Sequence, residues 1–143
     1  MVFLDTNVFV YTKDPGNLRK QRIAQKLIAE AIHEQKGLVS TQVIQEFCNV
    51  MLKKAEEPMS PRDLDELLAD ILFPMLRQGP SPDFYRRTLR LFEHESISFY
   101  DALIVQAALD LGCKTLYSED LQDGRKYGKL TIKNPFKQDK QGA

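Results

Sequence analysis

A short apolar run near the start of the chain, Val2-Phe3-Leu4, constrains the fold more than any other feature of the sequence. Such a run, β-branched and aromatic, is typical of a strand that is buried on both faces. Asp5 ends it abruptly, and an unpaired charge inside a buried strand is strongly unfavourable. We therefore expect Asp5 where the strand leaves the sheet, beside a positive partner or a metal ion. In an open parallel sheet, ligands bind at this edge.

Segments typical of strands and of helices alternate along the rest of the chain. Further short strands are expected at residues 38–40, 114–118 and 130–133. Helices are expected to begin after Asn17, Ser40 or Thr41, Ser60, Ser81 and Ser98, which are good N-caps. Gly37 and Gly112 are expected to end two of these helices. This alternation predicts a parallel α/β sheet with helices on both faces.

Length and composition indicate one soluble domain, residues 1–143, with a polar tail from about residue 137. The hydrophobic fraction is 43% and the charged fraction 28%, and no apolar run is long enough to span a bilayer. Asp5 also interrupts the apolar region that a signal peptide needs. We expect a cytoplasmic protein without membrane contact. Cys48 and Cys113 lack the spacing of a zinc site, and we expect buried free thiols rather than a disulfide.

Four acidic residues are expected to meet at one edge of this sheet. Asp5 and Asp120 each follow a strand closely, whereas Glu46 and Asp101 lie in the first two turns of helices. In a parallel sheet these positions share one edge. Two carboxylates about 4 Å apart repel by roughly 4 kcal/mol at an effective dielectric near 20, so such a cluster needs divalent cations or raised pKa values. Ligand sets made only of oxygen favour Mg²⁺ or Mn²⁺.

Each acid also has a structural alternative when it is taken alone. Asp101 and Ser98 form a capping-box pattern, and an acid there favours the helix dipole. Asp120 could be an N-cap or turn residue, and Glu46 could lie at a solvated helix edge. The conjunction of the four acids is what points to a site.

In these motifs the chain resembles the PIN-domain nucleases, and among them the VapC-type toxins of toxin–antitoxin systems. The matching motifs, in order, are Val-Phe-Leu-Asp5-Thr6-Asn7, Gln45-Glu46-Phe47, Phe99-Tyr100-Asp101-Ala102 and Ser118-Glu119-Asp120. The resemblance covers nearly the whole chain and implies a three-layer α/β/α sandwich with a central parallel sheet. It implies a magnesium- or manganese-dependent endoribonuclease that leaves a 5′-phosphate and a 3′-hydroxyl. It also implies a toxin that forms a homodimer and binds an antitoxin.

The resemblance also assigns roles to individual residues. The catalytic and metal-binding quartet would be Asp5, Glu46, Asp101 and Asp120, with Thr6, Asn7 and Ser118 as supporting polar residues. Asp123 could be an extra acid from the loop of Asp120, although an Asp–Gly turn is the alternative.

The RNA backbone requires positive charge from the protein. The chain carries 20 basic and 20 acidic residues, so a metal-bound quartet would leave a basic surplus of four. Arg125, Lys126 and Lys129, which follow Asp120, are the first candidates for phosphate contacts. Other basic residues that could bind RNA are Arg19, Lys20, Arg22, Lys53, Lys54, Arg86, Arg87 and Arg90. Tyr11, Tyr100 and Tyr117 could stack a base, with core packing as the alternative.

Three other functions remain open. A phosphatase of the haloacid dehalogenase type also uses an aspartate after the first strand, but it needs a second aspartate where this chain has Asn7. A PIN nuclease for housekeeping RNA processing and a PIN-fold binding module without cleavage are the others. His33 and His94 are expected at the surface, so metal-free cleavage by histidine acid–base chemistry has no clear support.

Overall fold

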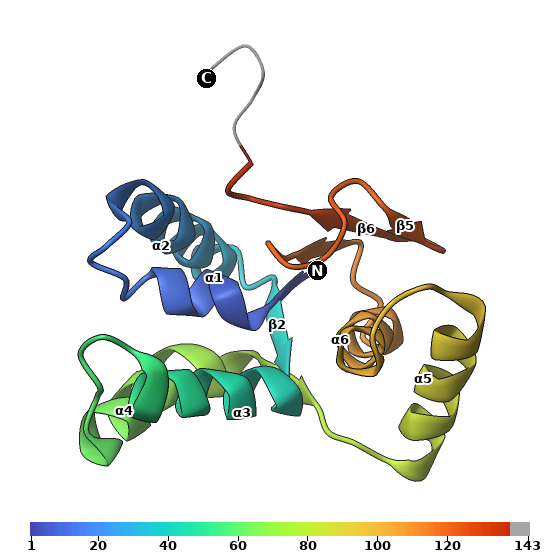
Figure 1. Cartoon of the computed structure of the whole chain (residues 1–143), viewed down its shortest axis with the longest axis horizontal. Helices are drawn as coiled ribbons and strands as arrows, with labels where there is room; N and C mark the ends of the chain where they lie inside the picture. Colours follow the sequence, from blue (N-terminus) through green and yellow to red (C-terminus); the bar gives the residue numbers. More distant parts are fainter. Residues whose placement is uncertain (138–143) are drawn as a thin grey trace.

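The computed structural model of the protein describes residues 1–137, and within them a sheet runs through the middle of the molecule (Figure 1). Its strands are β1 (Val2–Leu4), β2 (Gly37–Ser40), β3 (Leu76–Gln78), β4 (Thr115–Tyr117), β5 (Lys126–Tyr127) and β6 (Leu130–Lys133). Their spatial order is β3-β2-β1-β4-β6-β5. Neighbouring strands are parallel except β5, which pairs antiparallel with β6. The predicted parallel sheet is confirmed, with an antiparallel strand at one edge.

Helices cover both faces of this sheet. They are α1 (Thr6–Tyr11), α2 (Leu18–His33), α3 (Thr41–Asn49), α4 (Pro61–Leu67), α5 (Pro82–His94) and α6 (Phe99–Asp110). The π-helical turns η1 (Val50–Lys54) and η2 (Leu68–Leu72) extend α3 and α4, and the 3-10 turn η3 (Phe73–Met75) leads into β3. In Figure 1, α1 to α4 lie mainly to the left of β2, and α5 and α6 lie to its right, below β5 and β6. This is the α/β/α architecture that the sequence predicts.

The predicted caps account for most helix starts. Asn17, Ser60, Ser81 and Ser98 each accept a hydrogen bond at 3.1 Å from the backbone N–H three residues later. Such a bond satisfies one of the free N–H groups at a helix start. Ser40 precedes α3, as expected, but its side chain makes no cap bond.

Gly37 does not end α2, so that prediction was wrong. The helix ends at His33, and Gln35 makes the turn with a φ of 53°. Gly37 is instead the first residue of β2, where a Cβ would lie 3.1 Å from both Ala31 Cβ and Met75 Cε. Close packing of α2 against the sheet, not backbone conformation, therefore explains the glycine.

Three further expectations concern the cysteines, contact with a membrane and the C-terminal tail. Cys48 and Cys113 are free thiols, as predicted, but only Cys113 is buried and Cys48 is partly exposed. Burial raises the pKa of Cys113 to about 11. No helix in residues 1–137 is long and apolar enough to cross a membrane. The predicted polar tail beyond residue 137 lies outside the described residues.

Candidate active site

Asp5 lies at the carboxyl end of β1, caps α1, and has only 6% of its surface exposed. One carboxylate oxygen accepts a hydrogen bond from the Thr6 backbone N–H at 2.8 Å, and the other accepts one from the Ser118 hydroxyl at 2.7 Å. The pKa of Asp5 is raised from 3.8 to about 6, chiefly by burial and to a lesser extent by the charges of Glu46 and Asp120, while the two hydrogen bonds act in the opposite direction. A buried acid thus lies beside two other acids.

Glu46 and Asp120 are both held by the first turn of α1. Thr6 Oγ1 donates to Glu46 Oε2 at 3.0 Å, and Asn7 Nδ2 donates to Asp120 Oδ2 at 3.2 Å. Gln42 Nε2 donates to the other oxygen of Glu46 at 2.6 Å. All three donors are neutral, so they orient the carboxylates without removing their negative charge.

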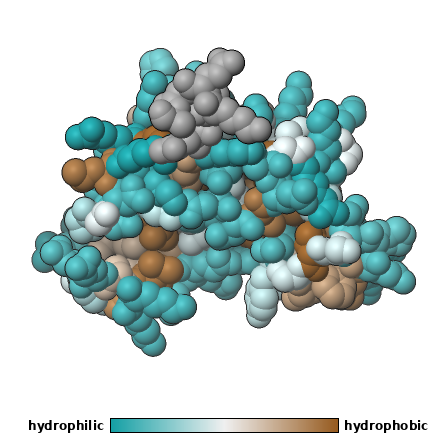
Figure 2. Space-filling view, turned by 45° about the horizontal axis from the view of Figure 1, so that its top comes forward, coloured by the Kyte–Doolittle hydropathy of each residue, from teal (hydrophilic) through white to brown (hydrophobic). Residues whose placement is uncertain are grey.

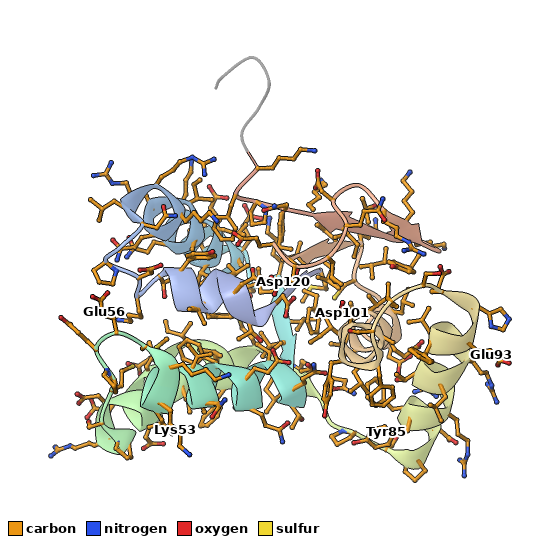
Figure 3. The ribbon with its side chains drawn as sticks, viewed as in Figure 1. Lys53, Glu56, Tyr85, Glu93, Asp101 and Asp120 are labelled. Carbon is orange, nitrogen blue, oxygen red and sulfur yellow. The ribbon has the colours of Figure 1, made fainter. Side chains whose placement is uncertain are left out.

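Asp101 reaches the same region from the first turn of α6 and is partly exposed. Figure 3 shows Asp101 and Asp120 in the central part of the molecule, at the start of α6 and after β4. Gln42 Nε2, which holds Glu46, also lies 3.3 Å from the carbonyl oxygen of Tyr100 and links α3 to the residue before Asp101. The structure therefore brings Asp5, Glu46 and Asp120 together, with Asp101 on a neighbouring element.

Ser118 and Asn7 make hydrogen bonds that link Asp5 to the loop that carries Asp120. Ser118 is fully buried, donates to Asp5, and accepts a hydrogen bond from the Asp120 N–H at 3.1 Å. Asn7 Oδ1 accepts one from the Glu119 N–H at 3.2 Å. These two side chains tie the loop after β4 to the start of α1, which places Asp120 beside Asp5.

Asp123 makes its contacts away from the four acids. It accepts hydrogen bonds from the Asn134 N–H at 2.8 Å and from Lys137 Nζ at 3.1 Å, and these bonds lower its pKa. Its position is that of a residue closing the loop against the segment after β6. Lys126 and Lys129 are exposed on the β5–β6 hairpin.

The side chain of Arg125 is held in place by two contacts. It forms an ion pair with Glu95, and its guanidinium carbon lies 4.8 Å from the centre of the Tyr127 ring. This pair joins the β5–β6 hairpin to the loop that precedes α6.

Sequence reasoning missed Gln42, and it named Lys20 and Tyr11 as possible RNA contacts without predicting their contact with Glu119. Gln42 lies four residues before Glu46, on the same face of α3, and this spacing was a signal that could have identified it. Lys20 binds Glu119 at 2.7 Å, and Tyr11 donates to the same carboxylate at 2.8 Å. Lys20 and Glu119 are 99 residues apart in the sequence, so no local sequence pattern predicts their contact.

The donor chemistry of the site fits a hard divalent cation. The converging side chains offer carboxylate, hydroxyl and amide oxygens, which Mg²⁺ and Mn²⁺ prefer. A cation would also offset the burial and repulsion that raise the pKa of Asp5. Among residues 1–137, however, no three acidic, histidine or cysteine side chains are already grouped closely enough to hold a metal ion. Binding would therefore require these carboxylates to move closer together.

Comparison with known proteins identifies a matching family and several similar structures. The family model described as PIN domain matches residues 2–128. The fold is similar to FitAcB from Neisseria gonorrhoeae, with 18% identity over 95% of this chain and 99% of that chain and a TM-score of 0.61. A toxin–antitoxin complex from Klebsiella pneumoniae gives 17% identity, coverage of 94% and 98%, and a TM-score of 0.66.

A third similar structure is VapC20 from Mycobacterium tuberculosis, described as a sarcin–ricin loop cleaving toxin. It gives 18% identity over 84% of this chain and 90% of that chain, with a TM-score of 0.60. No match was found among the curated proteins. Because the family model matches residues 2–128, most of the sequence, the chain belongs to the PIN domain family, whose members are nucleases.

Proposed function

We propose that this protein is a magnesium- or manganese-dependent endoribonuclease that acts in the cytoplasm as the toxin of a toxin–antitoxin pair. The observation that carries the proposal is the buried carboxylate of Asp5, whose pKa is raised to about 6 beside Glu46 and Asp120. Such an arrangement is unfavourable for an empty structural cluster and suited to a cation site.

The four acids hold the divalent cation in this proposal, and the polar residues around them fix its ligands. Asp5, Glu46, Asp101 and Asp120 supply the charge, while Thr6, Asn7 and Ser118 orient three of the carboxylates. A bound cation of this kind lowers the pKa of a water molecule and offsets charge on the phosphoryl oxygens. Asp123 supports the loop of Asp120 through its bonds to residues 134 and 137.

The reaction is hydrolysis of an RNA phosphodiester bond. The oxygen of water bonds to phosphorus, the bond to the 3′-oxygen breaks, and that oxygen takes a proton, which leaves a 5′-phosphate and a 3′-hydroxyl. Arg125, Lys126 and Lys129 bind backbone phosphates beside the acidic edge. No histidine takes part, consistent with the positions of His33 at the end of α2 and His94 at the end of α5.

The protein partners are an antitoxin and a second copy of the chain. The similar structure from Klebsiella pneumoniae is a toxin–antitoxin complex, which supports a toxin over a housekeeping nuclease. Figure 2 shows apolar side chains gathered at the lower right of the molecule, over α5. Leu89 and Phe92 on this helix are 55% and 44% exposed, as expected for a surface that another protein covers.

The decisive experiment is cleavage of a labelled RNA by protein purified free of any bound antitoxin. We expect cleavage with Mg²⁺ or Mn²⁺, none in excess EDTA, and recovery when the metal is restored. Asp120→Asn should abolish cleavage, whereas Asp70→Asn, an exposed aspartate on η2, should not. Cleavage that continues at the same rate in EDTA would exclude the metal-dependent mechanism.

A further inference from the structure

A cavity of about 260 Å³ opens beside the acidic edge, between the start of α3, β3 and the facing ends of α5 and α6. Four aromatic residues line it on the α5 and α6 side: Phe84, Tyr85, Phe99 and Tyr100. Figure 3 shows Tyr85 near the beginning of α5. Tyr100 is 69% exposed, and its ring centre lies 5.8 Å from that of Phe99. An exposed pair of aromatic rings at the mouth of a cavity is a surface on which a planar group can stack.

The inner wall of the same cavity carries two polar atoms that lack partners. Ser40 is 2% exposed and Gln78 is 9% exposed, and both line the cavity. Within residues 1–137, Ser40 Oγ and Gln78 Nε2 are the buried side-chain polar atoms for which no hydrogen bond is found. Leaving such an atom unpaired lowers the stability of the folded protein, so each unpaired atom calls for an explanation. A ligand that brings hydrogen-bond acceptors into the cavity would explain both unpaired atoms.

This cavity is linked to the acids through the side chain of Gln42. Gln42 lines it, and the same amide nitrogen donates to Glu46 and lies within 3.3 Å of the Tyr100 carbonyl oxygen. Tyr100 precedes Asp101 in the first turn of α6. Gln42 and Tyr100, which line the cavity, therefore separate a group seated in it from Glu46 and Asp101.

We propose that this cavity binds one unpaired nucleobase of the RNA, next to the bond that is cleaved. The inference rests on the proposed function and adds a base-reading subsite to it. The base stacks on the exposed ring of Tyr100 and meets the Phe99 ring at an edge, because the two rings are inclined at 71°. It turns an edge with acceptor atoms towards Gln78 Nε2 and the Ser40 hydroxyl. A volume of about 260 Å³ is smaller than the usual 300–1,000 Å³ of sites for drug-sized ligands, which suits one base. An apolar side chain of a protein partner would leave both polar atoms unpaired.

The test measures binding of short fluorescent RNAs of A, C, G or U in metal-free buffer, where cleavage does not occur. The wild-type protein should prefer one of the four bases. Gln78→Met keeps the length of the side chain but removes the amide, and it should reduce that preference to within about twofold. Tyr100→Ala should weaken binding of every RNA about tenfold, because it removes a base–aromatic stack.

The matched control is Gln106→Met, which removes another buried glutamine that is 8% exposed and hydrogen-bonded to Asp110. It should keep the base preference while lowering thermal stability. Gln78→Met should not lower it, since its amide nitrogen has no partner to lose. An unchanged preference in Gln78→Met with unchanged affinity in Tyr100→Ala would assign the cavity to a protein partner and overturn the inference, while RNA cleavage would leave the proposed function standing. Absence of both RNA binding and cleavage by the wild-type protein would overturn the two together.

Discussion

Asp5 shows how strongly one residue can be constrained by its surroundings. Its carboxylate is buried, and its pKa is raised to about 6 mainly because water is excluded. A carboxyl group whose pKa rises on folding is harder to ionise in the folded protein than in the unfolded chain. The folded protein therefore loses stability as the pH rises from about 3.8 to about 6, and it regains stability only if a cation binds.

We predict that Asp5→Asn stabilises the metal-free protein while abolishing cleavage. Above pH 6 the free energy of unfolding should rise by on the order of 3 kcal/mol, because each unit of pKa shift is worth about 1.4 kcal/mol. The gain should shrink towards zero as the pH falls to about 3.8. Thermal or denaturant unfolding at several pH values in EDTA measures it, with the exposed Asp65→Asn as control. A variant less stable than the wild type at pH 8 would show that Asp5 serves as a structural cap.

The lysines of the β5–β6 hairpin give a second prediction for single residues. Each phosphate contact contributes about 0.7 to the slope of binding against salt concentration for single strands. Replacing Lys126 and Lys129 by Ala should flatten this slope by about one unit or more and leave metal binding unchanged. Lys53→Ala with Lys54→Ala, at the end of η1, should not alter it. If the η1 pair flattens the slope instead, the RNA follows a different face of the molecule.

Arg125 is left out of that variant because its ion pair with Glu95 gives it a second role. Both side chains are about one third exposed or less, at 27% and 32%. A partly exposed pair of this kind contributes only about 1 kcal/mol or less. Its substitution would nonetheless mix a loss of RNA affinity with a change in the loop before α6.

At the scale of elements, the sequence predicted what depends on local chemistry. The N-caps and the long helices follow from side chains within three or four residues of each other, and β1 follows from an apolar run. β3 and β5 were not predicted, because strands of three and two residues at the sheet edges carry too little pattern. Gly37 was misjudged because its reason is a contact with Met75, which is distant in sequence.

The site also contains features that local sequence predicts and features that depend on tertiary contacts. The four acids could be named from the sequence, since each lies beside a strand end or helix start that is locally encoded. Lys20 with Glu119, and the cavity formed by Ser40, Gln78 and Tyr100, depend on which elements become neighbours. Only the folded structure supplies that information.

Gly37 allows the packing of α2 on the sheet to be tested directly. We predict that Gly37→Ala destabilises the protein by roughly 1–3 kcal/mol, because the new methyl group would crowd Ala31 and Met75. Gly79→Ala is the matched control, since a Cβ there meets no atom within 4 Å. Denaturant unfolding of the two variants measures the difference. Equal stability would mean that α2 can move away from β2 at little cost.

At the scale of the whole molecule, the exposed side chains of α5 predict self-association. Leu89→Glu combined with Phe92→Glu should convert a dimer to a monomer, because charges would be buried in an apolar contact. Light scattering across a range of concentrations measures the mass. Leu18→Glu is the control, because Leu18 is equally exposed, at 56%, but lies at the start of α2. A wild-type protein that stays monomeric at high micromolar concentration would contradict this prediction.

The position of β4 in the sheet has a consequence for when the site can exist. β4 pairs directly with β1, and the hydrogen bond between Ser118 and Asp5 joins residues 113 positions apart. During synthesis at about 5–20 residues per second, roughly 6–20 s separate the emergence of these two partners. A nascent chain therefore carries Asp5 and Glu46 without the loop that completes their site. Any nuclease activity belongs to the finished domain, and chains that stop before β4 are released without it.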